Sequence, residues 1–463
     1  MAVPISNGPS AGGNGLSPRF AVVTILKGMI GAGILSLPHV FGKVGLRLAV
    51  PGYLLISVIC AFSIWRLIEC KALLAARCLL QEDEQDSLSE KNGAEEVKDC
   101  GLGPLGSVSV QVLGPAGLVI AGFGIIASQL GFGIAYIDIV VETMSSDNLL
   151  GSSFSTVWLR VIVGLILCLL SCIRSLNGLA KISAVALVIY SYLIIALIRQ
   201  GGTEVVQGTA PDLAVVWGKV QWDNIGLWLG TAIFAQEAIV ISQYVFDDMK
   251  LANHRDFLPV LIWSFSICGT LCSLVGALGY MCYGDDVKSV FYLNFPRDSR
   301  DVCIAETVLC VVLLASFGLQ MYPVVSFLEA VFVGKAGETE SEESEEELSE
   351  SDKPSSGGGF FRAFLLPVAL RWSLVVLCSA VAVSIPDLSC VTGYSGSFAV
   401  STIGFFLPAL CHMKLNSFQL SPLDWALDIM LLLLGIASVI LGIEATHCGG
   451  DTVKIIQVIT KAA

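Results

Sequence analysis

The chain has 463 residues, of which 55% are apolar and 14% are charged, and its mean hydropathy is +0.78. Soluble domains carry about a quarter charged residues, so this composition excludes a soluble globular protein and indicates a polytopic membrane protein. The net charge of −13 comes from two short acidic segments, residues 82–99 and 338–352, and the remainder is close to neutral. The acidity therefore indicates neither an acidic nor a basic partner, and nothing predicts a nucleic-acid partner.

The first apolar run contains the sequence TILKGMIGAGILSLP (Thr24–Pro38), which places Gly28, Gly31 and Gly33 near the middle of a membrane span. Glycine costs about 1 kcal/mol relative to alanine in a helix interior. Backbone groups freed at membrane depth are tolerated only inside protein or beside a wet cavity. Two interpretations are open: a broken helix whose backbone binds a small ligand, or close helix packing through small residues.

Eleven apolar runs reach the length of about 20 residues that a membrane-spanning helix needs. They lie at roughly 20–42, 48–69, 112–141, 157–177, 179–199, 224–246, 256–283, 302–333, 362–384, 389–412 and 422–443. The sequence thus predicts an all-α transmembrane domain over residues 19–445. The odd number places the two ends on opposite sides, and the bias of lysine and arginine favours a cytoplasmic N-terminus.

The segments outside these runs are predicted to be tails and connections. Residues 1–18 are rich in Gly, Ser and Pro, lack a signal-peptide pattern, and are predicted to be a disordered tail. Residues 80–100 form an acidic cytoplasmic loop, 336–359 a disordered acidic cytoplasmic linker and 446–463 a C-terminal tail. The linker has almost nothing apolar to bury, and its serines among glutamates leave a phosphorylated segment as the alternative to a solvated connection.

Nothing in the sequence predicts a metal site, a cofactor or an enzyme. Most of the 15 cysteines lie inside apolar runs, where they serve as small hydrophobic side chains, and no CxxC pair occurs. The four histidines are scattered. No nucleophile–base constellation and no phosphate-binding loop of the Walker type appears, so ATP is not the expected energy source.

Several motifs together resemble the amino acid/auxin permease family, and in particular its proton-coupled animal branch and its vacuolar neutral amino acid transporters of fungi and plants. They occur in the family's order and cover nearly every span from 24 to 412. They are KGMIGAGILSLP, SQLGFGIAY (Ser128–Tyr136), LGTAIFAQEAIV (Leu229–Val240), ALGYMCYGDDVKSVFYLNFP (Ala277–Pro296), FGLQMYP (Phe317–Pro323) and VTGYSGSF (Val391–Phe398).

The resemblance implies the 5+5 inverted repeat of the amino acid–polyamine–organocation superfamily, in which spans 1 and 6 are both broken at the midplane. This favours the broken-helix interpretation of Gly28–Gly33. Span 6 departs from the family pattern of an aromatic residue, Glu and Gly, because Gln236, Glu237 and Ala238 stand there. The expected helix breaker is therefore missing from span 6.

An α-amino acid offers a carboxylate and an ammonium group to such a pair of breaks. The carboxylate suits the N-terminus of the second half of span 1, where free N–H groups and the helix dipole favour an anion. Gly31, Ala32 and Gly33 would supply this backbone, with Gly28 in the same cluster. The ammonium suits the carbonyl groups of span 6 near its break, at Phe234, Ala235 and Gln236.

Span 3 carries a stripe of side chains that one helical face can hold: Ser128, Gln129, Phe132 and Tyr136. The family places this motif beside the substrate. The alternative is that these side chains form hydrogen bonds between helices. Gln320 of span 8 is open to the same two interpretations.

Proton coupling requires a group that changes its protonation state. A histidine of the animal branch, three positions before the span-1 lysine, corresponds here to Thr24, which cannot serve. Glu237 is the candidate, since an apolar environment favours the neutral form of a carboxyl group, and His39 is the second. Asp138 and Glu142 lie near the outer end of span 3, where a hydrated mouth explains them equally well.

These observations predict a secondary active transporter of amino acids, small and neutral ones, coupled to protons and working by alternating access in a vacuolar, lysosomal or plasma membrane. Its expected partners are an amino acid, a proton and the lipid bilayer. The alternatives are an amino acid sensor that signals through the acidic cytoplasmic segments, and a transporter coupled to sodium or specific for an indole-type substrate.

Overall fold

The computed structural model describes residues 16–86, 102–146, 155–171, 176–208, 211–249, 251–295, 300–332, 366–385, 387–416 and 420–444. Within these ranges the chain is helical, and the single β-type contact is an isolated parallel bridge between Leu16 and Met249. A helix satisfies its backbone polar groups within its own segment, as a chain in lipid requires. The prediction of an all-α membrane protein is confirmed.

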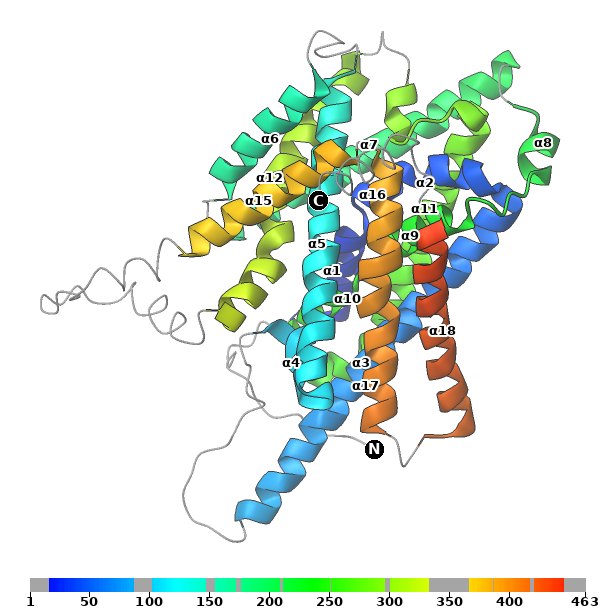
Figure 1. The fold of residues 1–463 in the computed structure, drawn as a ribbon. Coiled ribbons are helices and arrows are strands. Elements are labelled where there is room, and N and C mark those ends of the chain that lie inside the picture. Colours follow the sequence, from blue (N-terminus) through cyan, green and yellow to red (C-terminus); the bar gives the residue numbers. More distant parts are fainter. Residues whose placement is uncertain are drawn as a thin grey trace, which may run out of the picture.

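Each predicted apolar run falls mainly on one helix or on helices that follow each other directly in the chain (Figure 1). In chain order these are α1 (Pro18–Met29) with α2 (Ala32–Val44), α3 (Leu46–Asp86), α5 (Pro115–Met144), α6 (Thr156–Leu170), α7 (Leu176–Gln207), α9 (Ile225–Ala235) with α10 (Ile239–Asp248), α11 (Phe257–Tyr283), α12 (Arg300–Phe332), α15 (Leu366–Ser384), a composite helix over 388–415 and α18 (Pro422–Glu444). We call these spans 1 to 11. Shorter helices are α4 (Gly103–Leu113), α8 (Leu213–Gly218), η2 (Leu251–Asp256), η3 (Gly284–Asp286) and η4 (Phe291–Asn294).

Among the described helices, seven are long and apolar enough to cross a membrane, and the bent pair α1–α2 makes an eighth. Two shorter apolar helices, Thr156–Leu170 and Val368–Ser384, add to these. The multi-pass architecture is therefore established, while the number eleven for the crossing helices stays a prediction.

The helix α3 is much longer than its predicted run, with 41 residues. Its C-terminal end projects beyond the bundle (Figure 1), and the helix continues to Asp86, so the first residues of the predicted acidic loop 80–100 are helical. At the N-terminus, the backbone N–H of Leu16 donates to the carbonyl of Asp248 at 2.8 Å, so the predicted disordered tail ends earlier than residue 18. Residues 1–15, 87–100, the linker 336–359 and the tail 446–463 lie outside the described residues.

The two broken spans lie at the centre of the bundle. Gly226 to Ala235 are all buried in α9, and α2 is buried along most of its length. The surrounding helices instead expose large apolar side chains, among them Leu165, Leu169 and Val188. An apolar exterior around a tightly packed centre is the arrangement that a bilayer stabilises.

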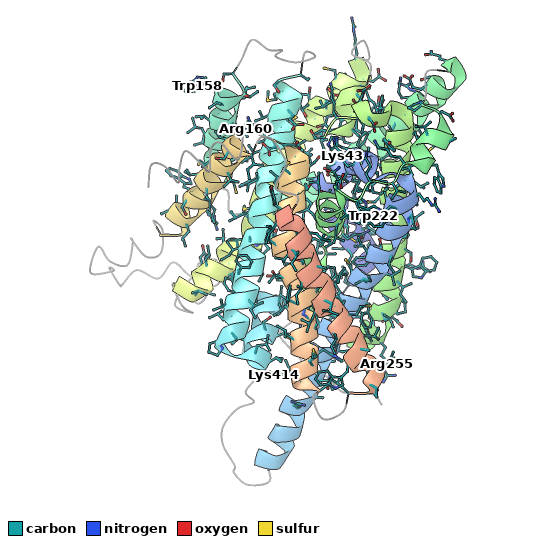
Figure 2. The ribbon with its side chains drawn as sticks, turned by 45° about the vertical axis from the view of Figure 1, so that its right-hand side comes forward. Lys43, Trp158, Arg160, Trp222, Arg255 and Lys414 are labelled. Carbon is teal, nitrogen blue, oxygen red and sulfur yellow. The ribbon has the colours of Figure 1, made fainter. Side chains whose placement is uncertain are left out.

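The positions of labelled side chains agree with the predicted alternation of the spans across the membrane. Figure 2 places Lys43 and Arg160 toward one end of the molecule and Arg255 and Lys414 at the opposite end. The sequence predicts the first two on the outer side and the last two on the cytoplasmic side. We call the end with Lys43 and Arg160 the outer end.

Candidate functional site

Span 1 is broken at Ile30 and Gly31, between α1 and α2, which are bent by 59° relative to each other. Ile30 is extended, with φ −79° and ψ 96°, and Gly31 has φ −151° and ψ −147°. The predicted break is confirmed, but it is narrower than Gly28–Gly33, because Gly28 lies within α1. The bond from Ile30 N–H to the Leu26 carbonyl, 2.9 Å, closes the last turn of α1.

Gly31 is followed by the free N-terminus of α2. No side chain caps this helix, and the first backbone N–H groups of a helix have no partner within it. A Cβ atom built on Gly31 meets no atom within 4 Å. Its φ lies outside the left-handed region that requires glycine. The glycine is therefore valuable here for the space it leaves beside the N–H groups of Ala32 and Gly33.

Gly33 has a different role from Gly31. A Cβ atom at Gly33 would lie 2.7 Å from both Cα and Cβ of Ala235, the last residue of α9. Gly33 thus brings the start of α2 into direct contact with the break of span 6. Gly28 packs one turn earlier, where a Cβ would lie 2.8 Å from Cδ1 of Ile241 on α10. For these two glycines the contacts are those of close helix packing.

Span 6 is interrupted at Gln236, Glu237 and Ala238, between α9 and α10. The N–H groups of Gln236 and Glu237 donate to the carbonyls of Ile233 and Phe234, each at 3.2 Å, in a tight final turn. The interruption was expected from the resemblance although the glycine is missing, and it is confirmed. Ala238 takes the non-helical position, with φ −146° and ψ 7°.

Two side chains hold this second break in place. Gln236 donates from Nε2 to Oγ of Ser57 on α3, while its Oε1 is buried and accepts no hydrogen bond from the described residues. The carboxylate of Glu237 accepts hydrogen bonds from the backbone of Ile239 and Val240 at the start of α10. Gln236 therefore faces the helix scaffold, and Glu237 supplies a negative charge at a helix N-terminus, where it is stabilising.

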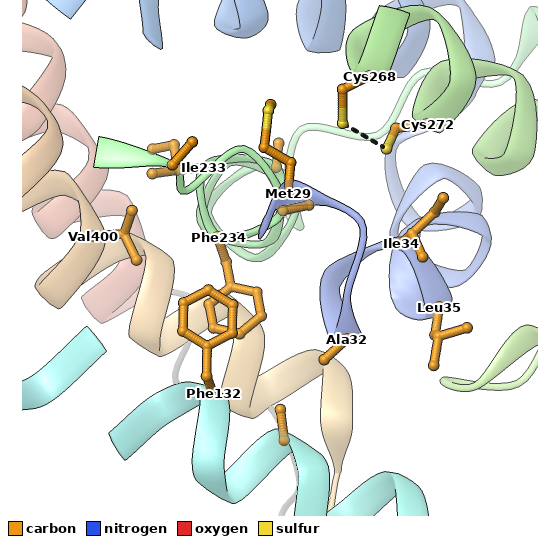
Figure 3. Close-up of a cluster of buried hydrophobic side chains, with 14 of the residues drawn as sticks. Met29, Ala32, Ile34, Leu35, Phe132, Ile233, Phe234, Cys268, Cys272 and Val400 are labelled. Atoms are coloured by element: carbon orange, nitrogen blue, oxygen red, sulfur yellow. Dashed lines mark hydrogen bonds between the residues drawn. The ribbon is translucent and has the colours of Figure 1, made fainter. Parts of the chain in front are cut away.

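The aromatic residue of the span-3 stripe reaches the break of span 6. The rings of Phe132 and Phe234 stack with centroids 4.1 Å apart and planes inclined by 28° (Figure 3). Ala32, the first residue of α2, belongs to the same buried cluster. The structure thus brings span 1, span 3 and span 6 together at this point.

The remaining stripe residues divide among other contacts. Gln129 accepts a hydrogen bond at Oε1 from Nε2 of Gln320 on α12 at 2.5 Å, which is an interhelical seam contact. Ser128 donates to the carbonyl of Ile125 within its own helix, at 3.2 Å. Tyr136 is half-buried. The span-3 stripe is therefore one helical face with several functions, and Phe132 is its member at the break.

His39 lies on α2, two turns beyond the break. Its Nδ1 donates to the carbonyl of Val287 at 2.8 Å. His39 and Glu237 are therefore held by different parts of the structure, and the coupling role of each stays a prediction. Within the described ranges, no group of three or more His, Cys, Asp or Glu side chains could hold a metal ion.

Span 10 adds a feature that the sequence analysis missed. Between α16 (Leu388–Tyr394) and α17 (Leu407–Leu415), the segments η8 (Ser395–Val400) and η9 (Thr402–Phe406) are π-helical. A Cβ atom on Gly396 would lie 1.7 Å from the carbonyl oxygen of Gly230, so span 10 packs backbone to backbone against α9. π-Helical turns occur frequently at functional sites. The small residues in the sequence VTGYSGSF were the one sequence feature we noted that could have indicated this close packing.

Comparison with known proteins gives concordant matches. The family described as "Transmembrane amino acid transporter protein" matches residues 14–447. The chain is 26% identical over 444 residues to vacuolar amino acid transporter 4 of Saccharomyces cerevisiae, covering 93% of this chain and 58% of that protein. It is 25% identical to vacuolar amino acid transporter 3 of the same yeast, over 90% of this chain and 54% of that protein. The chain thus spans little more than half the length of these two relatives.

A plant relative is matched over nearly its whole length. Amino acid transporter AVT3B of Arabidopsis thaliana is 25% identical, over 94% of this chain and 93% of that protein. A solved structure of a mutant manganese transporter of Eremococcus coleocola aligns with 99% of this chain and 94% of its own, at 13% identity and a TM-score of 0.49. The family match extends over both broken spans and the helices around them, and the chain belongs to the transmembrane amino acid transporter protein family.

Proposed function

We propose that this protein is a secondary active transporter of amino acids, selective for small neutral ones, that works by alternating access. The observation that carries the proposal is the open, uncapped backbone at Gly31, which lies between two half-helices and beside the break of span 6. An open backbone at the centre of a membrane bundle is costly unless it serves a ligand or a wet cavity. Membership of the amino acid transporter family supports an amino acid as that ligand.

The two ends of an amino acid fit the two breaks. Its carboxylate would accept hydrogen bonds from the N–H groups at the start of α2, where the helix dipole favours an anion. Its ammonium group would lie at the carbonyl groups where α9 ends, at Phe234 and Ala235. The contact of Gly33 with Ala235 keeps these two sets of backbone groups close together.

The side chain of the substrate would meet the Phe132–Phe234 stack. Two buried rings with centroids 4.1 Å apart lie in the same buried cluster as Ala32, the first residue of α2, and would offer the substrate an apolar surface. An apolar wall without a fixed charge favours neutral side chains, and the tight packing of α2, α5 and α9 favours small ones.

We further propose proton coupling through Glu237. Glu237 lies within the break of span 6 itself, and its Oε1 is buried and accepts no hydrogen bond from the described residues. A neutral carboxyl can pass through a dry, occluded state at far lower cost than a carboxylate, so binding a proton there would permit the change between outward-open and inward-open states. The relatives named vacuolar transporters suggest the vacuolar membrane as the location.

The test is uptake by the purified full chain in liposomes, with a panel of labelled amino acids and with or without a pH gradient. The expected result is accumulation of small neutral amino acids only when the gradient is present. Uptake driven equally well by sodium without a pH gradient would contradict the proton proposal. Binding without any turnover would instead support the sensor.

A paired substitution tests the site. Gly31→Val fills open space and meets no atom within 4 Å at its Cβ, so the fold should persist while substrate binding is lost. Gly202→Val on α7 is the matched control, because a Cβ there also meets nothing within 4 Å. Equal uptake by the two variants would exclude Gly31 from the site. Amino acid esters should also bind poorly, since they lack the anion.

A further inference from the structure

A second group of ionisable side chains lies at the outer end, away from both breaks. Asp138 and Glu142 are one turn apart on α5, Arg160 lies on α6, and Asp387 caps the start of α16. We propose that Asp138 and Glu142 form a proton-binding site, with Arg160 as its counter-charge, which exchanges a proton with the outer compartment. The proposal rests on the proposed transport function and adds to it a coupling site other than Glu237.

Asp138 and Arg160 form a buried pair with incomplete geometry. Asp138 has no exposed surface and Arg160 is 4% exposed, and a single contact of 3.4 Å joins Nη2 to Oδ1. Oδ2 of Asp138 and Nε of Arg160 are both buried and make no hydrogen bond with the described residues. A buried ion pair offsets the cost of desolvation only when its geometry is good and its remaining polar atoms are bonded. This pair fulfils neither condition.

Glu142 connects the same group to the start of span 10. Its Oε2 accepts a hydrogen bond from Ser289 at 3.3 Å, and its carboxylate also accepts one from the backbone of Leu388. Asp387 accepts from the N–H of Ser389 at 2.8 Å. Two carboxylates therefore meet at the N-terminus of α16, one from span 3 and one from span 10.

The charges of this group do not balance. Asp138, Glu142 and Asp387 interact with one another and with the single guanidinium of Arg160. Among the described residues, His39 on α2 interacts with Asp387 as well as with Lys43, and Glu306 on α12 lies near Tyr292. Like charges held close together in an apolar environment favour protonation of one of them. Asp138 has no exposed surface and its Oδ2 makes no hydrogen bond with the described residues, so we assign the proton to Asp138.

Proton binding would then act on the contact between spans. A proton from the outer compartment adds to Oδ2 of Asp138, an O–H bond forms and the carboxylate becomes neutral. Arg160 keeps its charge, and Glu142 remains as an ionised carboxylate of the group that interacts with it. Since Glu142 also binds the backbone at Leu388, protonation changes the contact between α5 and the start of α16.

The first experiment detects the proton directly and needs no substrate. Infrared difference spectra of the purified full chain, recorded while the pH is changed, should show the carbonyl stretch of a protonated carboxylic acid. This signal should disappear in Asp138→Asn and shift in Glu142→Gln. It should persist in Asp223→Asn, which alters an exposed aspartate at the same end of the molecule. An unchanged signal in both cluster variants would overturn the proposal, whether or not the protein transports amino acids.

The second experiment measures coupling in liposomes. In the unmodified protein a gradient of one pH unit supports up to about tenfold accumulation per coupled proton, and a pH dye should report proton movement with the substrate. Asp138→Asn should lose both and keep substrate exchange without a gradient. Failure of the unmodified protein to move any amino acid would refute the proposed function, and the infrared test would still decide on this site.

A double substitution separates a proton site from a merely structural ion pair. Asp138→Asn alone leaves Arg160 buried without its partner and could unfold the protein. Asp138→Asn with Arg160→Gln removes both charges and should fold. Accumulation and proton movement should stay absent in this variant while exchange continues. If they return, Asp138 serves only to balance Arg160 and the proposal is wrong.

Discussion

The breaks of span 1 and span 6 differ in the residues that form them and in the hydrogen bonds around them. In span 1 the chain opens at Ile30 and Gly31, the half-helices bend by 59°, and no side chain caps the new helix start. In span 6 the chain opens at three residues that include no glycine, and two polar side chains hold it open. At the first break a glycine leaves space beside the backbone, and at the second break the side chains of Gln236 and Glu237 form hydrogen bonds.

The difference shows which break is suited to hold a ligand and which to respond to one. Gly31 provides no side-chain cap at the start of α2, which under our proposal receives the substrate carboxylate, whereas the carboxylate of Glu237 already accepts hydrogen bonds at the start of α10. A carboxylate at the second break makes it sensitive to protons, because a neutral Glu237 accepts hydrogen bonds from N–H groups more weakly. Substitutions at the two breaks should therefore have different consequences.

The largest expected effect on stability comes from Gly33→Val. The new Cβ would overlap the backbone of Ala235 at 2.7 Å, and overpacking against backbone should cost about 3 kcal/mol or more. Thermal unfolding in detergent should show a clear loss relative to Gly31→Val. Equal melting temperatures for the two variants would mean that the contact between the breaks does not stabilise the fold.

Ser57→Ala should have the next largest effect. It leaves Nε2 of Gln236 buried without an acceptor, and such a group costs about 1–3 kcal/mol. Ser264→Ala is the control, since this buried serine bonds only to the carbonyl of Val260 in its own helix. A double-mutant cycle with Gln236→Ala should give a coupling energy of at least about 0.5 kcal/mol. A coupling near zero would show that this bond does not hold the second break.

Glu237→Gln should change stability less and coupling more. The amide keeps hydrogen-bond acceptors at the start of α10 but loses the charge, which at a helix N-terminus is worth about 0.3–1 kcal/mol. Uptake driven by a pH gradient should be lost while exchange without a gradient persists. If both activities survive with unchanged pH dependence, Glu237 is not a coupling residue. The remaining explanations of coupling are then His39, the site at Asp138 and Glu142, or sodium.

Gly28→Ala should have the smallest effect. The added methyl group meets the flexible end of Ile241 at 2.8 Å, and the cost of that contact is offset by the gain of about 1 kcal/mol from alanine in a helix interior. Melting temperature and substrate affinity should both stay close to those of the unmodified protein. A loss of binding would extend the site one turn into α1.

The sequence was most informative where glycine marks the structure. Three glycines in six residues located the break of span 1, although Gly31 alone lies at the open backbone. The break of span 6 could be expected only from the resemblance, because no glycine marks it and the side chain of Gln236 at the break bonds to Ser57, which is distant in sequence.

Within the candidate site, the helical period of the sequence identified which residues share one face of span 3, but not which neighbours they contact. The stripe of span 3 was correctly placed on one helix, yet Gln129 pairs with Gln320 while Phe132 stacks on Phe234. Which neighbour each side chain meets depends on how helices pack, and a helical period carries no such information. The π-helical turns of span 10 escaped detection because small residues are compatible with several helical forms.

The bridge between Leu16 and Met249 has a mechanical consequence. It joins the N-terminal end of α1 to the C-terminal end of α10, so these two half-helices are connected by one backbone hydrogen bond of 2.8 Å. Such a bond is worth about 0.5–1.5 kcal/mol, which is weak enough to break in a conformational change. Leu16→Pro would remove the N–H donor and so break this hydrogen bond, without changing any side chain of the spans. A pair of spectroscopic labels at these two positions would therefore measure any separation of α1 from α10 at this end of the molecule.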